Sequence, residues 1–368
     1  MRLTFSEIKN KIKKIIPEGI DYDVDLEAGS ISVITKEPAS FGGAGGQSLT
    51  VKIAKAIRRR VVIRPHPDLL SSENEVNDAV SRIMPEEALI RRIWLDPALS
   101  EVTIEADDPK SAVGQKGTNI QQLRNEIGWL VNVVRAPARE SRTQTDIRRF
   151  RKELADERKT LLRKFGTRIY RPQRPGPSWV RVTALGSYRE VGRAMHLVTT
   201  NESKVLVDCG AKPTNNRSEV QPFFAAPEML PLDNIDAVVI THAHVDHIGM
   251  LPVLFKYGYK GPVYCTQPTR DLMTLLQMDY IKVAQAEGND PPYSKSDIQE
   301  CIKHVVDINW GEKTDIAPDI KMTMENAGHI LGSSSVYMQI GEGRNEHKLL
   351  FSGDIKYEKS LLFDAATV

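Results

Sequence analysis

Three histidines and an aspartate fall within six positions of THAHVDHIGMLP, the segment that spans residues 241–252. The whole chain has 368 residues and only eight histidines, so a chance group of exposed polar side chains is a poor explanation. Imidazole and carboxylate groups suit zinc, and a pair of zinc ions can activate water in a hydrolase. The candidate metal ligands are therefore His242, His244, Asp246 and His247.

The residues around this cluster indicate a strand, a loop and a helix. NIDAVVIT (234–241) is typical of a buried strand, and IGMLPVLFKYG (248–258) predicts an amphipathic helix. The apolar side of that helix would consist of Ile248, Leu251, Leu254 and Phe255. The cluster would then occupy the loop at the C-terminal end of a strand, where open α/β sheets place their sites. Extended spacing would direct His242, His244 and Asp246 to one side of the loop, and Asp246 and His247 could diverge towards a second metal.

Composition limits the class of protein. The length suits two or three domains, and the apolar runs are too short to span a bilayer. The N-terminal residues lack the apolar stretch of a secretory signal. The three cysteines, Cys209, Cys265 and Cys301, are isolated and odd in number, which favours a reducing compartment. We expect a cytoplasmic protein without a membrane partner, in which Cys209 is a buried, unreactive thiol.

Positive charge is concentrated in one segment. Residues 140–174 contain 12 Lys and Arg against 5 Asp and Glu, a local charge of +7 in a chain whose net charge is +2. Such asymmetry can mark a surface for a polyanion. The signs also mix along the segment, which is equally typical of a solvated helix held by salt bridges. Both interpretations remain open.

The first half of the chain contains two copies of one pattern. Copy one has a helical pattern near residues 8–16, strands at 21–26 and 30–35, a helix at 49–59 and a strand at 61–65. Copy two has the same order, with a helix at 73–84, strands at 88–95 and 101–106, a helix at 118–128 and a strand at 130–135. The glycine clusters Gly43–Gly46 and Gly114–Gly117 lie 71 positions apart, so the repeat is about 70 residues long.

The sequence pattern changes after the repeat. The charged residues 144–164 predict one helix, and the three prolines of YRPQRPGPSW (170–179) are typical of a linker. Short strands then alternate with helical stretches, which is an α/β pattern. We therefore predict a chain that is α/β in its last part and α+β overall.

Four blocks together resemble the metallo-β-lactamase fold. HAHVDH lies between a strand and a helix, KVLVDCG carries Asp208, AGHILGSSS carries His329 and LLFSGDIKY carries Asp354. Alone, His329 is more often a satisfied polar residue, and Asp354 could cap a turn. The resemblance implies that one zinc ion is held by His242, His244 and His329, a second by Asp246 and His247, and both by Asp354. It also implies that Asp208 orients the ligands, so Asp246 and Asp208 are the expected catalytic residues.

Two further segments narrow the family. LGSYREVGRAMHLV (185–198) is similar to the glycine-rich entry of β-CASP nucleases, and SAVGQKGTNIQQLRNEIG (111–128) resembles a prokaryotic-type KH domain. In KH domains a G-x-x-G turn clamps a single-stranded backbone, because glycine allows close approach and the next helix offers its positive end. The expected RNA-binding residues are Gly114, Gln115, Lys116 and Gly117. Copy one has surplus glycines and no basic residue in its turn, so we expect a structural role for it.

The whole arrangement resembles the archaeal homologues of the cleavage and polyadenylation specificity factor endonuclease, whose KH-bearing branch acts in transcription termination. The expected domains are a KH-like domain (1–69), a KH domain (70–139), a basic helical linker (140–176) and the front part of a metallo-β-lactamase αββα sandwich (177–368). The resemblance implies a zinc-dependent RNA endonuclease with two zinc ions, and also 5′-to-3′ exonuclease action. The implied partners are single-stranded RNA, RNA polymerase and a second copy of the intact protein.

The resemblance also implies what should follow Asp354, namely a β-CASP cassette, a late histidine ligand and a dimerisation region. We therefore expect the chain to be the front part of a longer protein that, alone, binds RNA but cleaves it poorly. Two other functions remain open. One is an RNA-binding module with an inactive metal domain, and the other is a metallo-hydrolase of small molecules.

Overall fold

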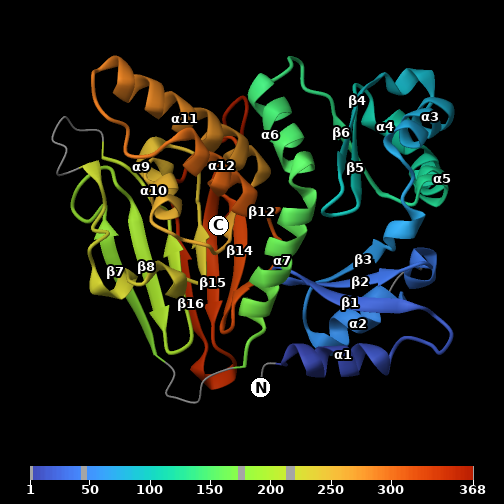
Figure 1. Ribbon diagram of the computed structural model, residues 1–368, viewed down its shortest axis with the longest axis horizontal. Coiled ribbons are helices and arrows are strands. Elements are labelled where there is room, and N and C mark those ends of the chain that lie inside the picture. The colour runs from blue at the N-terminus through green and yellow to red at the C-terminus, as the bar shows by residue number, and fades with distance from the viewer. Residues whose placement is uncertain (1–2, 43–47, 173–178, 213–219, 368) are drawn as a thin grey trace. The chain divides into compact units, whose positions relative to one another are not determined.

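The chain forms two units, each with its own sheets and core (Figure 1). The structure, a computed structural model, describes residues 3–42, 48–172, 179–212 and 220–367. One unit is Ser6–Arg163, and the other joins Met1–Phe5 to Lys164–Val368. The glycine cluster Gly43–Gly46 and the linker prolines Pro175 and Pro177 lie outside the described residues.

The predicted repeat is present in the first unit. Copy one consists of α1 (Phe5–Lys13), β1 (Tyr22–Glu27), β2 (Ser30–Thr35), a 3₁₀ turn η1 (Pro38–Phe41), α2 (Leu49–Ile57) and β3 (Val61–Pro65). Copy two consists of α3 (Glu73–Ile83), β4 (Ile90–Asp96), β5 (Glu101–Ala106), α4 (Pro109–Val113), a 3₁₀ turn η5 (Gln115–Gly117), α5 (Thr118–Ile127) and β6 (Leu130–Arg135). In each copy the first two strands pair antiparallel and the third joins the second in parallel.

Apolar spacing explains why the two helices of each copy cover their sheet. In copy two, Val76 and Val80 of α3 and Leu123 and Ile127 of α5 are buried with the strand residues Val102 and Ile104. Residues four apart lie on one face of a helix, so each helix turns one apolar face to the sheet. A capping box starts α3, because Ser72 accepts from the Glu75 amide and the Glu75 carboxylate accepts from the Ser72 amide.

A buried arginine joins the two copies. The guanidinium of Arg64 at the end of β3 donates to Glu27 of copy one at 2.9 Å and to Glu101 of copy two at 2.7 Å. The Arg64 side chain is 8% exposed, and the two glutamates are 18% and 27% exposed. Solvent therefore screens these pairs less than it screens a surface ion pair.

We expect Arg64→Ala to lower the free energy of unfolding of this unit by about 3 kcal/mol, because it leaves two carboxylates close together without their cation. Urea unfolding followed by circular dichroism measures the change. The control is Arg163→Ala, which removes a more exposed pair with Asp25 and should cost less than about 1 kcal/mol. Equal losses in the two variants would show that burial of Arg64 contributes nothing.

The charged segment forms two helices, so the prediction of one helix over 144–164 is wrong. They are α6 (Arg142–Glu153) and α7 (Ala155–Ile169), and Leu154 lies between them with φ −98° and ψ 24°. The buried Arg158 donates to the Arg151 carbonyl at 3.3 Å and to Asp96 at 2.9 Å. This tertiary contact caps the end of α6, and the local sequence gives no sign of it.

The second unit contains two sheets that pack face to face. The six-stranded sheet has the order β12-β11-β10-β9-β8-β7, and the four-stranded sheet has the order β13-β14-β15-β16. Their bounds are β7 (Val180–Gly186), β8 (Met195–Thr200), β9 (Lys204–Val207), β10 (Ala237–Val239), β11 (Val263–Cys265), β12 (Val305–Asp307), β13 (Thr314–Ala317), β14 (Ile320–Asn326), β15 (Ser334–Ile340) and β16 (His347–Phe351). One apolar core, with Val205 and Val239 from the first sheet and Met322 and Met338 from the second, fills the space between them.

Four helices lie beside the six-stranded sheet (Figure 1), namely α9 (Val245–Ile248), α10 (Leu251–Lys256), α11 (Gln267–Ala286) and α12 (Lys295–His304). The predicted amphipathic helix over 248–258 is wrong in two respects. Its helical part is limited to α10, since α9 ends at Ile248. The first five residues of α10 are all buried, so α10 has no polar face over those positions. Among the described residues, no helix combines the length and the apolar character needed to cross a bilayer.

Candidate metal centre

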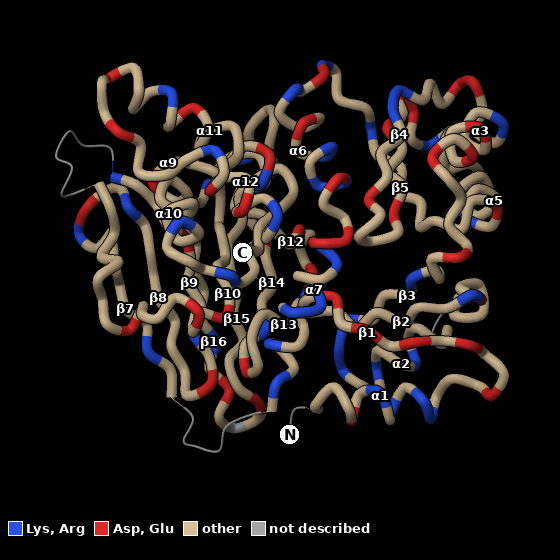
Figure 2. The backbone as a smooth tube through the Cα atoms, viewed as in Figure 1, with Lys and Arg blue, Asp and Glu red and all other residues tan. Residues whose placement is uncertain are grey.

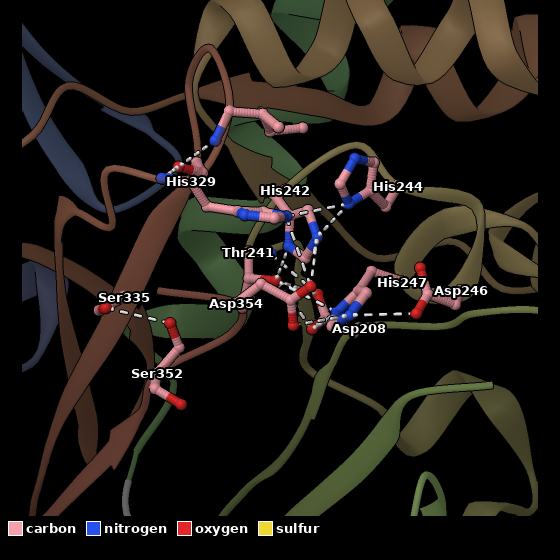
Figure 3. Close-up of polar contacts among 12 residues, drawn as sticks. Asp208, Thr241, His242, His244, Asp246, His247, His329, Ser335, Ser352 and Asp354 are labelled. Atoms are coloured by element: carbon pink, nitrogen blue, oxygen red, sulfur yellow. Dashed lines mark hydrogen bonds and ion pairs between the residues drawn. The ribbon is translucent and has the colours of Figure 1, made fainter. Parts of the chain in front are cut away.

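The predicted ligands meet where four segments end (Figure 3). Strands β9, β10, β11 and β12 run parallel, and Asp208 follows β9 while His242 follows β10 at the same edge. His329 lies between β14 and β15, and Asp354 follows β16. Parallel strands bring their C-terminal ends to one edge, which explains why residues distant in sequence converge.

Asp246 and His247 lie in a helix, whereas the sequence predicted a loop. His244 is the N-cap of α9, and both residues belong to this helix. The helix is fixed from the neighbouring strand, because the Cys209 amide donates to the His247 carbonyl at 2.8 Å. Cys209 is a free, buried cysteine, so its predicted burial is confirmed. Burial also raises the pKa of its thiol, and the lack of reactivity stays a prediction.

Three imidazole nitrogens form the centre of the cluster. His244 Nδ1 lies 3.2 Å from His242 Nε2 and 3.1 Å from His329 Nε2. Nitrogens bound to a tetrahedral zinc ion at about 2.0–2.1 Å would lie roughly 3.3 Å apart. The donor types and their spacing therefore fit a zinc ion.

Asp354 faces two sets of donors. Its Oδ2 lies 3.7 Å from His242 Nε2 and 3.4 Å from His329 Nε2, and its Oδ1 lies 3.5 Å from His247 Nε2. Together with His244, one ligand atom from each of His242, His329 and Asp354 falls within 4.8 Å of the others. Asp246 Oδ2 lies 3.8 Å from His247 Nε2, the same nitrogen that Asp354 Oδ1 faces. A single carboxylate thus lies between two groups of candidate ligands.

Asp208 contacts a histidine of each group, His247 directly and His242 through Thr241. Its Oδ2 lies 2.8 Å from His247 Nδ1 and 2.9 Å from Thr241 Oγ1, and its Oδ1 accepts from the Thr241 amide at 2.8 Å. Thr241 Oγ1 in turn lies 3.0 Å from His242 Nδ1. Asp208 has a φ of 61°, a left-handed conformation that is uncommon for residues other than glycine. The sequence pointed to Asp208, but nothing in it identified Thr241.

The loops of the two remote ligands are fixed by hydroxyl groups. Ser333 Oγ accepts from the His329 amide at 3.1 Å, and Ser335 Oγ donates to the Ser352 carbonyl at 3.0 Å (Figure 3). Gly353 has a φ of 56°, and a Cβ there would lie 2.9 Å from the Thr241 Cβ. The glycine before Asp354 therefore allows its loop to pack directly on Thr241.

Burial and charge give the histidines of the two groups opposite protonation preferences. Burial and the neighbouring histidines lower the pKa of His242 to about 2, so its imidazole is neutral, as metal binding requires. Burial also lowers the pKa of His247, but the negative charge and hydrogen bond of Asp208 outweigh it and raise that pKa to about 9. In the absence of a metal, the Asp208 carboxylate therefore favours the charged form of His247.

The predicted G-x-x-G turn joins two helices in copy two. Gly114, Lys116 and Gly117 have φ values of 75°, 53° and 80°, and the Gln115 and Lys116 side chains are exposed. A Cβ at Gly114 would lie 2.7 Å from the Asn119 side chain, so a glycine is required there. The geometry suits close approach of a backbone, and the RNA role of these residues stays a prediction.

The basic segment is held largely by ion pairs, so the salt-bridge interpretation is the better one. Its cations pair as Arg142–Asp146, Arg148–Glu105, Lys152–Glu73, Arg158–Asp96, Arg163–Asp25, Arg168–Asp236 and Arg171–Asp236. Because these acids occupy part of the hydrogen-bonding capacity of the cations, the local charge of the sequence overstates the attraction for a polyanion.

Two family models match the chain. Residues 197–368 match a metallo-beta-lactamase superfamily domain, and residues 2–70 match the KH domain of transcription termination factor FttA. The first range contains the predicted metal ligands and the second is copy one. The expectation of a mixed α/β chain with a KH domain before a metallo-β-lactamase domain is confirmed.

Curated relatives match nearly the whole chain. The transcription termination factor FttA of Methanosarcina mazei is 44% identical over 361 residues, which cover 98% of this chain and 56% of the relative. The factor of the same name from Thermococcus kodakarensis is 40% identical and covers 98% and 56%, and that of Lokiarchaeum sp. is 37% identical and covers 100% and 57%. The chain therefore spans a little more than half the length of these relatives.

Proposed function

Because the chain belongs to the family of transcription termination factor FttA, we propose that it cleaves single-stranded RNA during transcription termination, using zinc at the candidate metal centre. Endonuclease cleavage is the proposed main activity, with 5′-to-3′ exonuclease action at the same centre and RNA polymerase as a partner. The observation that supports this most is the position of Asp354 between two groups of histidine and aspartate side chains.

In this proposal His242, His244 and His329 would hold one zinc ion, Asp246 and His247 would hold the other, and Asp354 would contribute to both. When bound, the two ions supply Lewis acidity that activates water and offsets negative charge on a phosphodiester. Asp208 keeps the rings of His242 and His247 oriented, directly or through Thr241. Asp246 is the other catalytic residue, since its partly exposed carboxylate lies 3.8 Å from His247 Nε2.

Copy two supplies the proposed grip on the substrate. The turn would face the sugar-phosphate backbone of a single strand with its backbone amides. It consists of Gly114, Gln115, Lys116 and Gly117. The N-terminus of α5 directly follows this turn and favours negative charge. Binding and cleavage are thus assigned to different residues, which makes them separable by mutation.

Removal of metal is expected to abolish cleavage without abolishing RNA binding. The purified chain should retain zinc after dialysis, and a chelator should remove both the zinc and the cleavage until zinc is added back. Because water is the proposed nucleophile, an RNA with 2′-O-methyl groups at the cleavage site should still be cut, leaving 5′-phosphate ends. Zinc content and end-group analysis of the products measure both statements.

Two outcomes would contradict the proposal. Cleavage that survives chelation and requires a free 2′-hydroxyl would mean that the metal centre is not the catalyst. Stoichiometric zinc and tight RNA binding without any cleavage would favour the alternative of a binding module with an inactive metal domain.

A further inference from the structure

The helices of copy one carry a group of exposed cations, as the blue segments along α1 and α2 show (Figure 2). The two helices are adjacent, because Lys11 Nζ reaches the Ala56 carbonyl at 3.4 Å. Their buried sides hold only isoleucines, namely Ile8, Ile12, Ile53 and Ile57. We name the exposed cations Lys11, Lys13, Lys14, Lys52, Lys55 and Arg58 the basic helical face.

Opposite charge is scarce around this face. Residues 5–14 and 49–58 contain seven Lys and Arg and one acid, Glu7, which is a net charge of +6. Among the residues that the structure describes, Lys13, Lys14, Lys52, Lys55 and Arg58 form no ion pair. This is the reverse of the basic segment of residues 142–171, whose cations largely have acidic partners. The basic helical face therefore keeps its full attraction for an external polyanion.

The same face of copy two shows that the fold does not require these cations. Its helices α3 and α5 contain Glu73, Glu75, Asp78 and Glu126 against Arg82 and Arg124, a net charge of −2. Arg82 pairs with Glu126 there. Over the helices alone, α1 and α2 contain five lysines and one acid, a net charge of +4, so the equivalent helices of the two copies differ by six charges. A structural explanation of the lysines would have to apply to both copies.

We propose that the basic helical face of copy one binds the phosphodiester backbone of a nucleic-acid strand without reading its bases. Lysine ammonium groups on exposed helices suit phosphate oxygens. Residues 5–14 and 49–58 contain no Trp or Tyr and one Phe, Phe5, so the face lacks an array of stacking side chains for bases. Copy one therefore contributes affinity through its helices, independently of its glycine turn, and copy two contributes a separate contact at its G-x-x-G turn. This surface is additional to the proposed cleavage and does not depend on it.

The test is the salt dependence of binding to a variant with Lys13→Gln, Lys52→Gln and Lys55→Gln. Fluorescence anisotropy with labelled oligo(U) and oligo(A), in a chelator so that no cleavage occurs, gives Kd over a series of KCl concentrations. The slope of log K against log salt is negative, and each lost phosphate contact reduces its magnitude by about 0.7. Loss of three contacts should therefore reduce the magnitude by about 2. At 0.1 M salt the affinity should fall at least tenfold, equally for both RNAs and for single-stranded DNA of the same length.

Two further variants keep the test decisive. Lys260→Gln, Lys282→Gln and Lys295→Gln remove three exposed cations from the other unit and should leave the slope unchanged. Arginine in place of Lys13, Lys52 and Lys55 keeps the charge and should retain the slope even if the glutamine variant is destabilised. An unchanged slope in the glutamine variant would overturn the proposal. An equal loss of slope and affinity in the variant with Lys260→Gln, Lys282→Gln and Lys295→Gln would also overturn the proposal, because the change in net charge alone would then explain the loss.

Discussion

Alanine in place of His244 is expected to abolish RNA cleavage and to remove the zinc ion assigned to His242, His244 and His329, with RNA affinity unchanged. His244 Nδ1 is the nitrogen that lies within 3.2 Å of both other imidazole nitrogens, so its loss leaves His242 and His329 without the donor between them. Changes to residues that only orient ligands cost about 10–100-fold in metal affinity or activity. Loss of a ligand should therefore lower metal affinity and activity by more than about 100-fold. Zinc per chain and the initial rate of cleavage measure these effects.

His347→Ala is the matched control, since this histidine is exposed on β16 and belongs to no ligand group. It should retain both zinc and activity. If His244→Ala cut RNA at the normal rate, cleavage would have to come from another part of the chain or from a contaminating nuclease.

The reciprocal variant carries Gly114→Asp and Gly117→Asp. Both glycines have positive φ, a Cβ at Gly114 would meet Asn119, and two added carboxylates would repel phosphate. RNA binding should weaken at least tenfold with the zinc content unchanged. If each variant lost only its own property, binding and cleavage would be separate functions of the two units, whereas a joint loss would indicate a general folding defect.

The residues around the metal centre could be predicted from sequence because their chemistry is encoded locally. His242, His244, Asp246 and His247 are neighbours along the chain, and His329 and Asp354 lie in blocks that resemble one family in sequence order. The repeat could be predicted for a similar reason, since helical and strand periods are local patterns. Four of the six candidate ligands lie within 4.8 Å of one another, and His247 and Asp246 adjoin them on the other side of Asp354. Their role in binding zinc stays a prediction.

What the sequence could not provide depends on contacts between distant residues. Arg158 ends α6 by reaching across to Asp96, and a run of good helix formers gives no sign of that break. The basic residues 140–174 looked equally suited to a polyanion or to salt bridges, because their acidic partners lie as far away as Asp25 and Asp236. The same limit hid the basic helical face, since a lysine is recognised as unpaired only when its surroundings are known.

Thr241 is the clearest case of a residue that only geometry reveals, and its hydroxyl carries the last prediction. A hydroxyl has one hydrogen to donate and two lone pairs. If Thr241 Oγ1 donates to Asp208 at 2.9 Å, it accepts the Nδ1–H of His242 at 3.0 Å. His242 then presents the lone pair of Nε2 to the cluster. Because the Nδ1–H of His247 donates to Asp208 at 2.8 Å, His247 would do the same once a metal displaces its Nε2 proton. One carboxylate therefore sets the tautomer of a histidine in each ligand group.

We expect Thr241→Val to weaken zinc binding by about 10–100-fold, because valine has nearly the same shape and lacks the hydroxyl. Thr241→Ser keeps the hydroxyl and should bind zinc almost normally. Competition with a chromophoric chelator gives the affinities, and cobalt spectra report ligand geometry without any need for activity. Normal zinc affinity in Thr241→Val, with a normal unfolding midpoint of the metal-free protein, would show that the hydroxyl does not orient His242.

Asp208→Asn should have the larger effect. One carboxylate oxygen lies beside both His247 and the Thr241 hydroxyl while the other accepts from the Thr241 amide, and the NH2 group of asparagine cannot replace an accepting oxygen. Both groups of ligands would lose orientation, whereas Thr241→Val affects only the one that contains His242. Because Thr241 acts through Asp208, the double variant should lose little more than Asp208→Asn alone, a non-additivity that independent sites more than about 7–10 Å apart do not show. Additive losses would mean that the two residues support the metal centre separately, and the relay from Asp208 through Thr241 to His242 would be wrong.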